Sequence, residues 1–157
     1  MTDKQKEITE RLKREFEVCD KHILRIHQAM ERLGLPIPLS VDDYVYMNDE
    51  QIACVDQFIF RFSKLQDAMG AKIFRLILSY LGDDVTSLPM RDVLNRLERY
   101  ELLPSVDEWI YLRDLRNDLA HDYPLLEANV VAILNQLFVK VEELISIYTK
   151  IAKQVTF

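Results

Sequence analysis

The chain has 157 residues, of which 49% are hydrophobic and 29% charged, so it can form one sizeable core but not two ordinary domains. Its three glycines and five prolines, about 5% of residues against about 12% in average proteins, are too few for a β-sandwich or a low-complexity chain, and the apolar content argues against disorder. Its 26 acidic and 20 basic residues give a formal charge of −6, which disfavours broad binding of duplex DNA but leaves room for a confined nucleic-acid site. We therefore expect one mainly helical domain over residues 1–157.

Apolar residues recur every three or four positions along four long stretches, a period typical of bundle helices with one buried stripe. The first stripe begins at Ile8 and its helix ends at Gly34. Two prolines follow, so residues 34–47 are expected to form a connecting loop. The second stretch covers about 48–81, and at Gly70 its helix is expected either to kink or to split.

The second half of the chain predicts three more helices. A shorter helix is expected over about 87–102, with a proline in its first turn. Residues 105–108 match the capping box S-x-x-E and start a helix that ends near Ala120. Residues 121–124 are expected to form a turn, because the residue before a proline disfavours the α region, and the last helix is expected over about 125–155. The predicted fold is an all-α bundle of four long helices plus one short helix.

Cysteine usage and the absence of long apolar runs indicate the setting. Cys19 and Cys54 are the only cysteines and lack CxxC spacing, so we expect buried free thiols in a reducing compartment. Residues 1–17 are charged throughout and have no apolar segment of the kind found in signal peptides. No apolar run is long enough to cross a bilayer, so we expect a cytoplasmic protein without a membrane segment.

One segment carries residue types that suit phosphate chemistry. Residues 112–124 read L-R-D-L-R-N-D-L-A-H-D-Y-P, and they place Arg116, Asn117, His121 and Tyr123 around the end of one predicted helix. Cleaving RNA without a metal requires one group that takes a proton from the 2′-hydroxyl and another that stabilises charge on the phosphate. Histidine, with an ordinary pKa of about 6.5, can do the first, and the planar, permanently charged guanidinium of arginine can do the second.

The pattern R-x4-H-x-Y, with a polar residue after the arginine, resembles the signature of the HEPN superfamily and most closely that of its HepT-type ribonuclease toxins. The similarity in length and helix order covers the whole chain, and its detail lies in residues 116–123. The resemblance implies a homodimeric endoribonuclease that needs no cofactor, with RNA as substrate and tRNA as the favoured class. It implies that Arg116 acts on the phosphate, that His121 transfers the proton and that Asn117 supports them. It also implies an MNT-type nucleotidyltransferase antitoxin as partner, which attaches AMP to Tyr123.

The spacing of the motif limits how its two catalytic groups can meet. At about 100° per residue, the five positions from Arg116 to His121 turn through roughly 500°, so on a straight helix the side chains lie about 140° apart. Either the helix ends before His121, or two subunits each contribute an arginine and a histidine to a composite site. The resemblance implies the second arrangement, with the paired motifs in a cleft between subunits.

Each motif residue also has a purely structural interpretation. Arg116 suits the C-terminal end of a helix dipole, His121 suits a cap or a surface position, and Tyr123 suits packing across a helix junction. Related HEPN bundles resemble non-catalytic, substrate-binding partners of small nucleotidyltransferases, which is the alternative function. A structural helical bundle without either activity is the third interpretation.

Two weaker patterns concern metals and basic charge. The spacings Asp118-x-x-His121 and His27-x3-Glu31 are compatible with metal binding, but the chain has no Glu-x-x-His, so no metal site is expected. Residues 61–75 carry a local charge of +3 and are a candidate second basic surface, with a solvated helix face as the simpler interpretation. The basic residues there are Arg61, Lys64, Lys72 and Arg75, against the single acidic residue Asp67.

Overall fold

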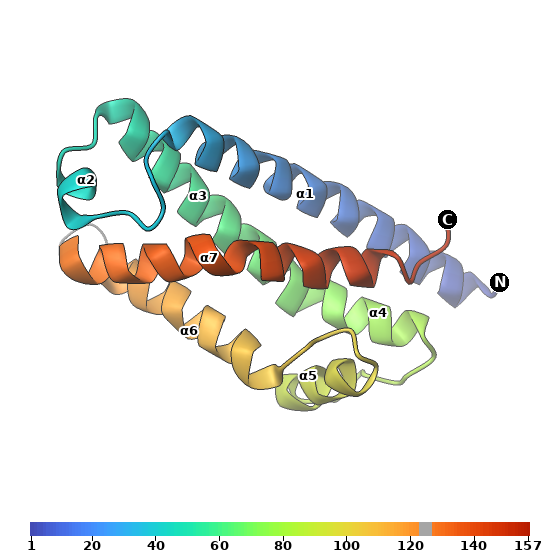
Figure 1. Ribbon diagram of the computed structural model, residues 1–157. Coiled ribbons are helices and arrows are strands. Elements are labelled where there is room, and N and C mark those ends of the chain that lie inside the picture. Colours follow the sequence, from blue (N-terminus) through green and yellow to red (C-terminus); the bar gives the residue numbers. More distant parts are fainter. Residues whose placement is uncertain (123–126) are drawn as a thin grey trace.

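The computed structural model describes residues 1–122 and 127–157, and the secondary structure of this part of the chain consists of helices, without strands (Figure 1). The predicted all-α class is therefore confirmed. The helices are α1 (Asp3–Leu33), α2 (Val41–Val45), α3 (Asp49–Ala68), the π-helical segment η1 (Met69–Ile73), α4 (Phe74–Tyr80), α5 (Met90–Arg99), α6 (Val106–Asp122) and α7 (Glu127–Ala152). None of the helices described is both long enough and apolar enough to cross a membrane.

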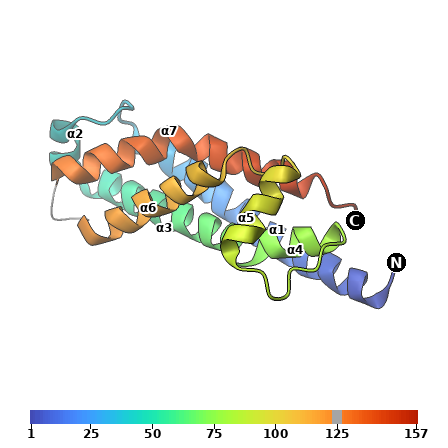
Figure 2. The ribbon, with the colours of Figure 1, turned by 90° about the horizontal axis from the view of Figure 1, so that it is seen from below.

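The long helices lie side by side and enclose one apolar core. α1 packs along α3 and α4, while α6 packs on α7. α2 and the end of α6 lie at one end of the bundle, and α5 lies with both termini at the other, as Figure 1 and Figure 2 show. The core is centred on fully buried aromatic and aliphatic side chains, each worth about 1.5–3 kcal/mol in transfer from water. Its largest members include Leu12, Ile26, Phe58, Phe62 and Phe74.

Local capping explains where α1 begins and ends. The Thr2 hydroxyl accepts a hydrogen bond from the Gln5 backbone N–H at 3.2 Å, and the Gln5 side chain accepts one from the Thr2 N–H at 3.3 Å. This reciprocal pair is a capping box that satisfies two exposed donors. The helix ends at Gly34, whose φ of 65° is left-handed and is readily adopted only by a residue without a side chain.

The predicted loop over residues 34–47 contains a short helix, so that prediction was incomplete. The Ser40 hydroxyl accepts a hydrogen bond from the Asp43 N–H at 3.0 Å and begins α2, which packs on α7. The side chain of Asn135 in α7 binds both backbone groups of Leu39, at 2.7 and 2.9 Å. No residue of α2 is buried, so the sequence carried no apolar period that could reveal it.

The long stretch predicted over 48–81 is one continuous rod. The Asn48 side chain caps α3, accepting from the Gln51 N–H at 2.8 Å. The backbone stays helical through Gly70, where a single π-helical turn replaces the kink or split that the sequence left open. A Cβ placed on Gly70 would lie 3.3 Å from Cζ2 of Trp109, so the glycine lets α6 approach this turn closely.

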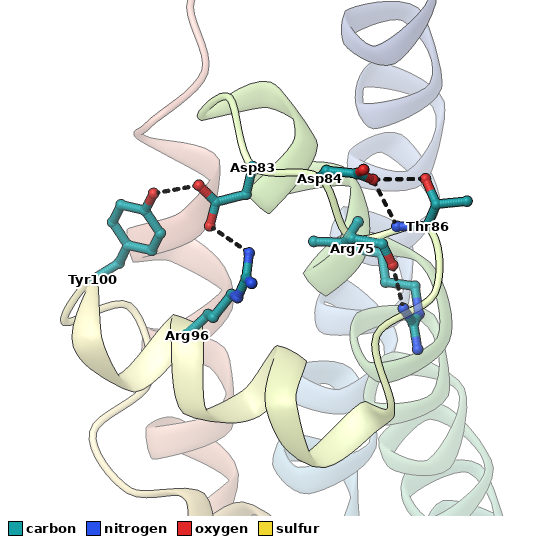
Figure 3. A network of polar contacts seen from close by, with 7 residues as sticks. Arg75, Asp83, Asp84, Thr86, Arg96 and Tyr100 are labelled. Atoms are coloured by element: carbon teal, nitrogen blue, oxygen red, sulfur yellow. Dashed lines mark hydrogen bonds and ion pairs between the residues drawn. The ribbon is translucent and has the colours of Figure 1, made fainter.

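Polar contacts fix the connection between α4 and α5, as Figure 3 shows. Asp83 accepts hydrogen bonds from the Tyr100 hydroxyl at 2.9 Å and from Arg96 at 3.5 Å. Arg75 reaches from α4 and donates to the backbone carbonyl of Val85 at 3.0 Å. α5 covers Met90–Arg99, so it is shorter at both ends than the stretch predicted over 87–102. Residues 87–89 and 100–102, which lie outside α5, belong to the caps and turns at its two ends.

α6 and α7 differ from prediction at their ends. The Ser105 hydroxyl accepts from the Glu108 N–H at 3.1 Å, as a capping box requires, but the Glu108 carboxylate pairs with Lys140 of α7 at 3.1 Å. α6 continues to Asp122, so the turn predicted for residues 121–124 is wrong at its first two positions. A proline at 124 restricts only the residue before it, and nothing in the preceding pair prevents helix formation. α7 ends at Ala152, three residues before the predicted end.

Candidate functional site

Arg116 lies on the side of α6 that faces α3, and its guanidinium is bound there. Nη1 donates to the Ser63 carbonyl at 3.3 Å and forms an ion pair with the Asp67 carboxylate, both on α3. Nη2 donates to the side-chain oxygen of the neighbouring Asn117 at 3.1 Å. The Arg116 side chain is only 16% exposed, whereas that of Asp67 is 59% exposed. Arg116 is thus held in place by three partners, and the charged partner, Asp67, faces solvent.

In this environment a carboxylate competes with any phosphate for the guanidinium of Arg116. A guanidinium has five N–H donors in a fixed plane, so three contacts leave donors unused. The Asp67 carboxylate occupies the position that a phosphate oxygen would take on Nη1, because both are anionic acceptors with similar geometry. Binding of phosphate by Arg116 therefore requires that Asp67 be displaced or share the guanidinium.

His121 is exposed in the last turn of α6, on the side that faces α7. It lines a shallow hollow of about 250 Å³, which we call the His121 hollow. The other lining residues are Asp118 of α6 and Asn129, Ala132 and Ile133 of α7. The imidazole is therefore accessible to solvent and to a second molecule, while the hollow is smaller than the roughly 300–1,000 Å³ of typical ligand pockets.

A single chain does not bring Arg116 and His121 together. Arg116 contacts α3, while His121 borders α7, and α6 is helical through both positions. Of the two arrangements left open by the motif spacing, the one in which the helix ends before His121 is therefore excluded. Of the predicted site residues, the structure brings Arg116 and Asn117 into contact. Tyr123, the predicted AMP attachment site, lies outside the described residues.

The residues with metal-compatible spacing make other contacts. Nε2 of His27 lies 3.1 Å from the carboxylate of Glu142 on α7. Asp118 and His121 both line the His121 hollow, without a third ligand. In the part of the chain that the structure describes, no group of three or more histidine, cysteine, aspartate or glutamate residues is placed to hold a metal ion.

The basic residues of 61–75 do not form one surface. Arg61 contacts His22 of α1, with 3.0 Å between Nη1 and Nδ1. Burial, and then the charge of Arg61, lowers the pKa of His22, which favours the neutral imidazole that accepts this hydrogen bond. Lys72 pairs with Glu15 of α1 at 3.5 Å, and Arg75 is bound to the α4–α5 connection.

Sequence analysis missed two features of this region. One is the pairing of Arg116 with Asp67, which no local sequence pattern predicts because the two residues are 49 positions apart. The other is a groove between α1 and α3 in which Arg61 joins Arg25 and Arg32. The signal for the second was present, because residues seven apart lie on the same face of a helix.

Comparisons with known protein families, with curated proteins and with solved structures found no match. The functional argument therefore depends on the residues of this chain and on their geometry.

Proposed function

We propose that the chain is a metal-independent endoribonuclease of the HepT type, a HEPN-like bundle that acts as a homodimer on RNA, with tRNA as the favoured substrate. The observation that carries this proposal is the position of Arg116, Asn117 and His121 in the last turns of α6. There His121 is exposed beside a hollow, and Arg116 is charged and linked to Asn117. The residue types, and the access of His121 to solvent, suit acid–base cleavage of a phosphodiester.

The proposed reaction uses the 2′-hydroxyl of the substrate as nucleophile. His121 takes its proton, the 2′-oxygen attacks the adjacent phosphorus, and the bond from phosphorus to the 5′-oxygen breaks. The leaving 5′-oxygen takes up a proton, so the products are a 2′,3′-cyclic phosphate and a 5′-hydroxyl. Arg116 stabilises the additional negative charge on the phosphate oxygens in the transition state.

The composite site follows from the directions of the two side chains. Because Arg116 faces α3 and His121 borders α7 within one chain, Arg116 of one subunit and His121 of the other are proposed to meet across a two-fold axis. A phosphate bound there replaces Asp67 as the anionic partner of Arg116. On this proposal an isolated subunit is inactive.

The proposed regulator is an MNT-type nucleotidyltransferase antitoxin that transfers AMP to Tyr123 in the cytoplasm. Tyr123 is two residues from His121 in the sequence. AMP on its hydroxyl adds a bulky anion beside the cleft, which opposes the RNA phosphate by charge as well as by volume.

The deciding experiment is cleavage of bulk tRNA in excess chelator by protein whose intact mass shows no attached AMP. We expect the unmodified dimer to cleave, and His121→Ala and Arg116→Ala each to lose at least a hundredfold in rate. His27→Ala and Arg113→Ala serve as matched controls, since they remove a histidine and an arginine outside the motif. No cleavage by the unmodified dimer, or equal losses in the controls, would contradict the proposal.

A second candidate is a non-catalytic HEPN module that binds substrate for a small nucleotidyltransferase. The ion pair between Arg116 and Asp67 favours it, because the arginine already has an anionic partner. In this candidate the motif serves the partner interface or nucleotide binding, so His121→Ala weakens binding of the nucleotidyltransferase or of nucleotide while the unmodified dimer cleaves no tRNA.

A further inference from the structure

A groove of about 440 Å³ lies between α1 and α3, and we call it the arginine groove. Its charged side chains are Arg25 and Arg32 from α1 and Arg61 and Glu50 from α3. The remaining wall consists of small or neutral residues, namely Gln28, Ala29, Ala53, Cys54 and Gln57. Three guanidiniums therefore share this groove with one carboxylate, in a chain whose formal charge is −6.

The three guanidiniums of the groove keep their charge uncompensated. Among the ion pairs formed by the described residues, none includes Arg25, Arg32 or Arg61. Arg25 donates to the Gln28 side chain at 2.8 Å, and this neutral partner leaves its charge in place. Charged, unneutralised guanidiniums are the donors that form the strongest hydrogen bonds to phosphate oxygens.

Arg61 is positioned for this role by its neighbours. Its Nη1 contacts Nδ1 of His22 at 3.0 Å, and its guanidinium carbon lies 5.5 Å from the centre of the Phe60 ring. Its Nε is buried and has no hydrogen-bond partner among the described residues. The guanidinium is thus held between a histidine and an aromatic ring, neither of which carries a negative charge.

The spacing along α1 suits an extended polyanion. Arg25 and Arg32 are two helical turns apart, which is a rise of about 10.5 Å, and a nucleic-acid strand carries about three phosphates over that length of helix axis. Arg11 lies on the same face, and it lines a second basic hollow of about 560 Å³ with Lys72 and Arg75. The spacing of Arg25 and Arg32 along α1 is matched by a chain of phosphates better than by a single small anion.

The groove is also placed suitably with respect to the motif. Arg61 extends from α3 toward α1, whereas Ser63 and Asp67 of the same helix contact Arg116 of α6. Arg61 and the residues that contact Arg116 therefore lie on different sides of α3, and Asp67 is six residues, or about 9 Å of helix rise, beyond Arg61. A strand of several nucleotides can span both the width of α3 and this rise.

We propose that the arginine groove binds the phosphate backbone of an RNA strand, with Arg25, Arg32 and Arg61 as the phosphate ligands. The choice of RNA as the polyanion rests on the proposed function. The groove itself is an independent feature of the α1–α3 pair, so binding can be measured without cleavage. RNA bound there extends across α3 toward Arg116, and the groove holds the substrate while the motif cleaves it.

The test uses the full chain carrying His121→Ala and measures the fluorescence anisotropy of fluorescein-labelled bulk tRNA over a series of KCl concentrations. The groove variant combines Arg25→Gln, Arg32→Gln and Arg61→Gln. The matched control combines Lys13→Gln, Arg99→Gln and Lys153→Gln, which removes three exposed charges elsewhere and gives the same net charge. We expect the groove variant to lose at least about tenfold in affinity and to flatten the salt dependence by about two in slope, and the control to change less than about twofold.

Equal losses in the groove variant and the control, or an unchanged affinity of the groove variant, would overturn the proposal. Should the triple variant show a changed circular dichroism spectrum, the double variant at the exposed Arg25 and Arg32 gives the answer in its place. Polyglutamate is the second probe, and a larger loss for polyglutamate than for tRNA would assign the groove to an acidic protein instead. If the groove variant loses tRNA binding but the unmodified chain cleaves no tRNA, only the proposed nuclease activity is contradicted. If the groove variant cleaves tRNA with an unchanged KM, only the proposed role of the groove is contradicted.

Discussion

At the residue scale, the proposed chemistry depends on how firmly Asp67 holds Arg116. The ion pair joins a mostly buried guanidinium to a carboxylate that is 59% exposed. Exposed carboxylates contribute little through such pairs, about 0–1 kcal/mol, because water and salt screen them. The Ser63 carbonyl and Asn117 hold the guanidinium as well, so its orientation does not depend on the carboxylate alone.

Replacing Asp67 by asparagine tests this competition directly. We expect Asp67→Asn to lower the free energy of unfolding by about 1 kcal/mol or less and to raise tRNA cleavage severalfold at subsaturating substrate, because phosphate no longer competes with a carboxylate. Urea denaturation and initial cleavage rates measure the two effects. Asp114→Asn, which removes an exposed carboxylate on α6 that pairs with Arg113, is the control. A tenfold fall in cleavage for Asp67→Asn would show instead that the carboxylate positions Arg116.

The two cysteines are expected to be inert in the folded chain. Burial, and then the nearby Glu15 and Asp20, raises the pKa of Cys19 to about 12, and burial followed by Glu50 raises the pKa of Cys54. The thiolate is the reactive form, and at pH 8 a pKa of about 12 leaves about one thiol in ten thousand ionised. Ellman's reagent should therefore react promptly with both thiols in denaturant and with neither promptly in the native protein. In the native protein Cys54 should react faster than Cys19. Rapid native reaction of Cys19 would contradict its burial.

At the element scale, the π-helical turn at Met69–Ile73 sets how α6 meets α3 and α4. Gly70 faces Trp109, which is buried and packs against the Phe74 ring with 4.6 Å between the ring centres. π-helical turns are rare and occur mostly as single turns within longer α-helices. At this turn the indole ring of Trp109 lies against the space where a side chain at position 70 would stand.

A β-branched residue at position 70 should therefore be costly. We expect Gly70→Val to lower the free energy of unfolding by about 2 kcal/mol, because overpacking against a buried ring typically costs about 1–3 kcal/mol. Ala71→Val is the matched control, since residue 71 is exposed in the same π-helical segment and loses only helix propensity, below about 1 kcal/mol. Thermal and urea unfolding followed by circular dichroism measures both. Equal stabilities would show that Trp109 moves aside at no cost.

Most of the fold was predictable because long helices carry long apolar stripes. The positions from Ile8 to Leu33 repeat often enough that the buried face of α1 follows from the sequence, and the all-α class follows from several such stripes. Features without a stripe were not predictable. α2 buries no residue, and α6 continues two residues beyond the end near Ala120 that the sequence predicts.

The candidate site was predictable only as far as its local part. The angle between Arg116 and His121 follows from helical geometry, and the structure places them toward different neighbouring helices. The partners were not predictable, because Asp67 reaches Arg116 from another helix. Likewise the stretch over 61–75 is a candidate second basic surface in the sequence, with a solvated helix face as the simpler interpretation, while tertiary packing directs Arg61 and Lys72 to different partners on α1.

At the scale of the whole molecule, charge is distributed unevenly over an acidic chain. The arginine groove lies between α1 and α3, and the second basic hollow lies between α1, η1 and α4, although acidic residues outnumber basic ones overall. Such a distribution concentrates attraction for a polyanion in local patches of an acidic molecule. In the proposed dimer each subunit presents its own groove.

The composite site makes a prediction that no single chain can satisfy. Two-fold symmetry gives two equivalent pairs, each with Arg116 from one subunit and His121 from the other. In a heterodimer of the Arg116→Ala and His121→Ala chains, one pair is fully intact and the other lacks both groups. When equal amounts of the two inactive variants exchange subunits, half of the dimers are mixed, and each mixed dimer has one intact site of two. About a quarter of the tRNA cleavage shown by the same amount of unsubstituted protein should therefore return.

The control for this experiment pairs Arg116→Ala with a chain that carries both substitutions, since no dimer in that mixture contains the arginine. It should stay inactive under the same exchange conditions. Native mass spectrometry establishes that mixed dimers have formed, and excess chelator keeps metal-dependent contaminants silent. Mixed dimers that form without regaining cleavage would exclude a site shared between subunits. Because Arg116 and His121 of one chain lie on different sides of α6, that result would leave the motif without a geometry for catalysis and favour the non-catalytic binding module.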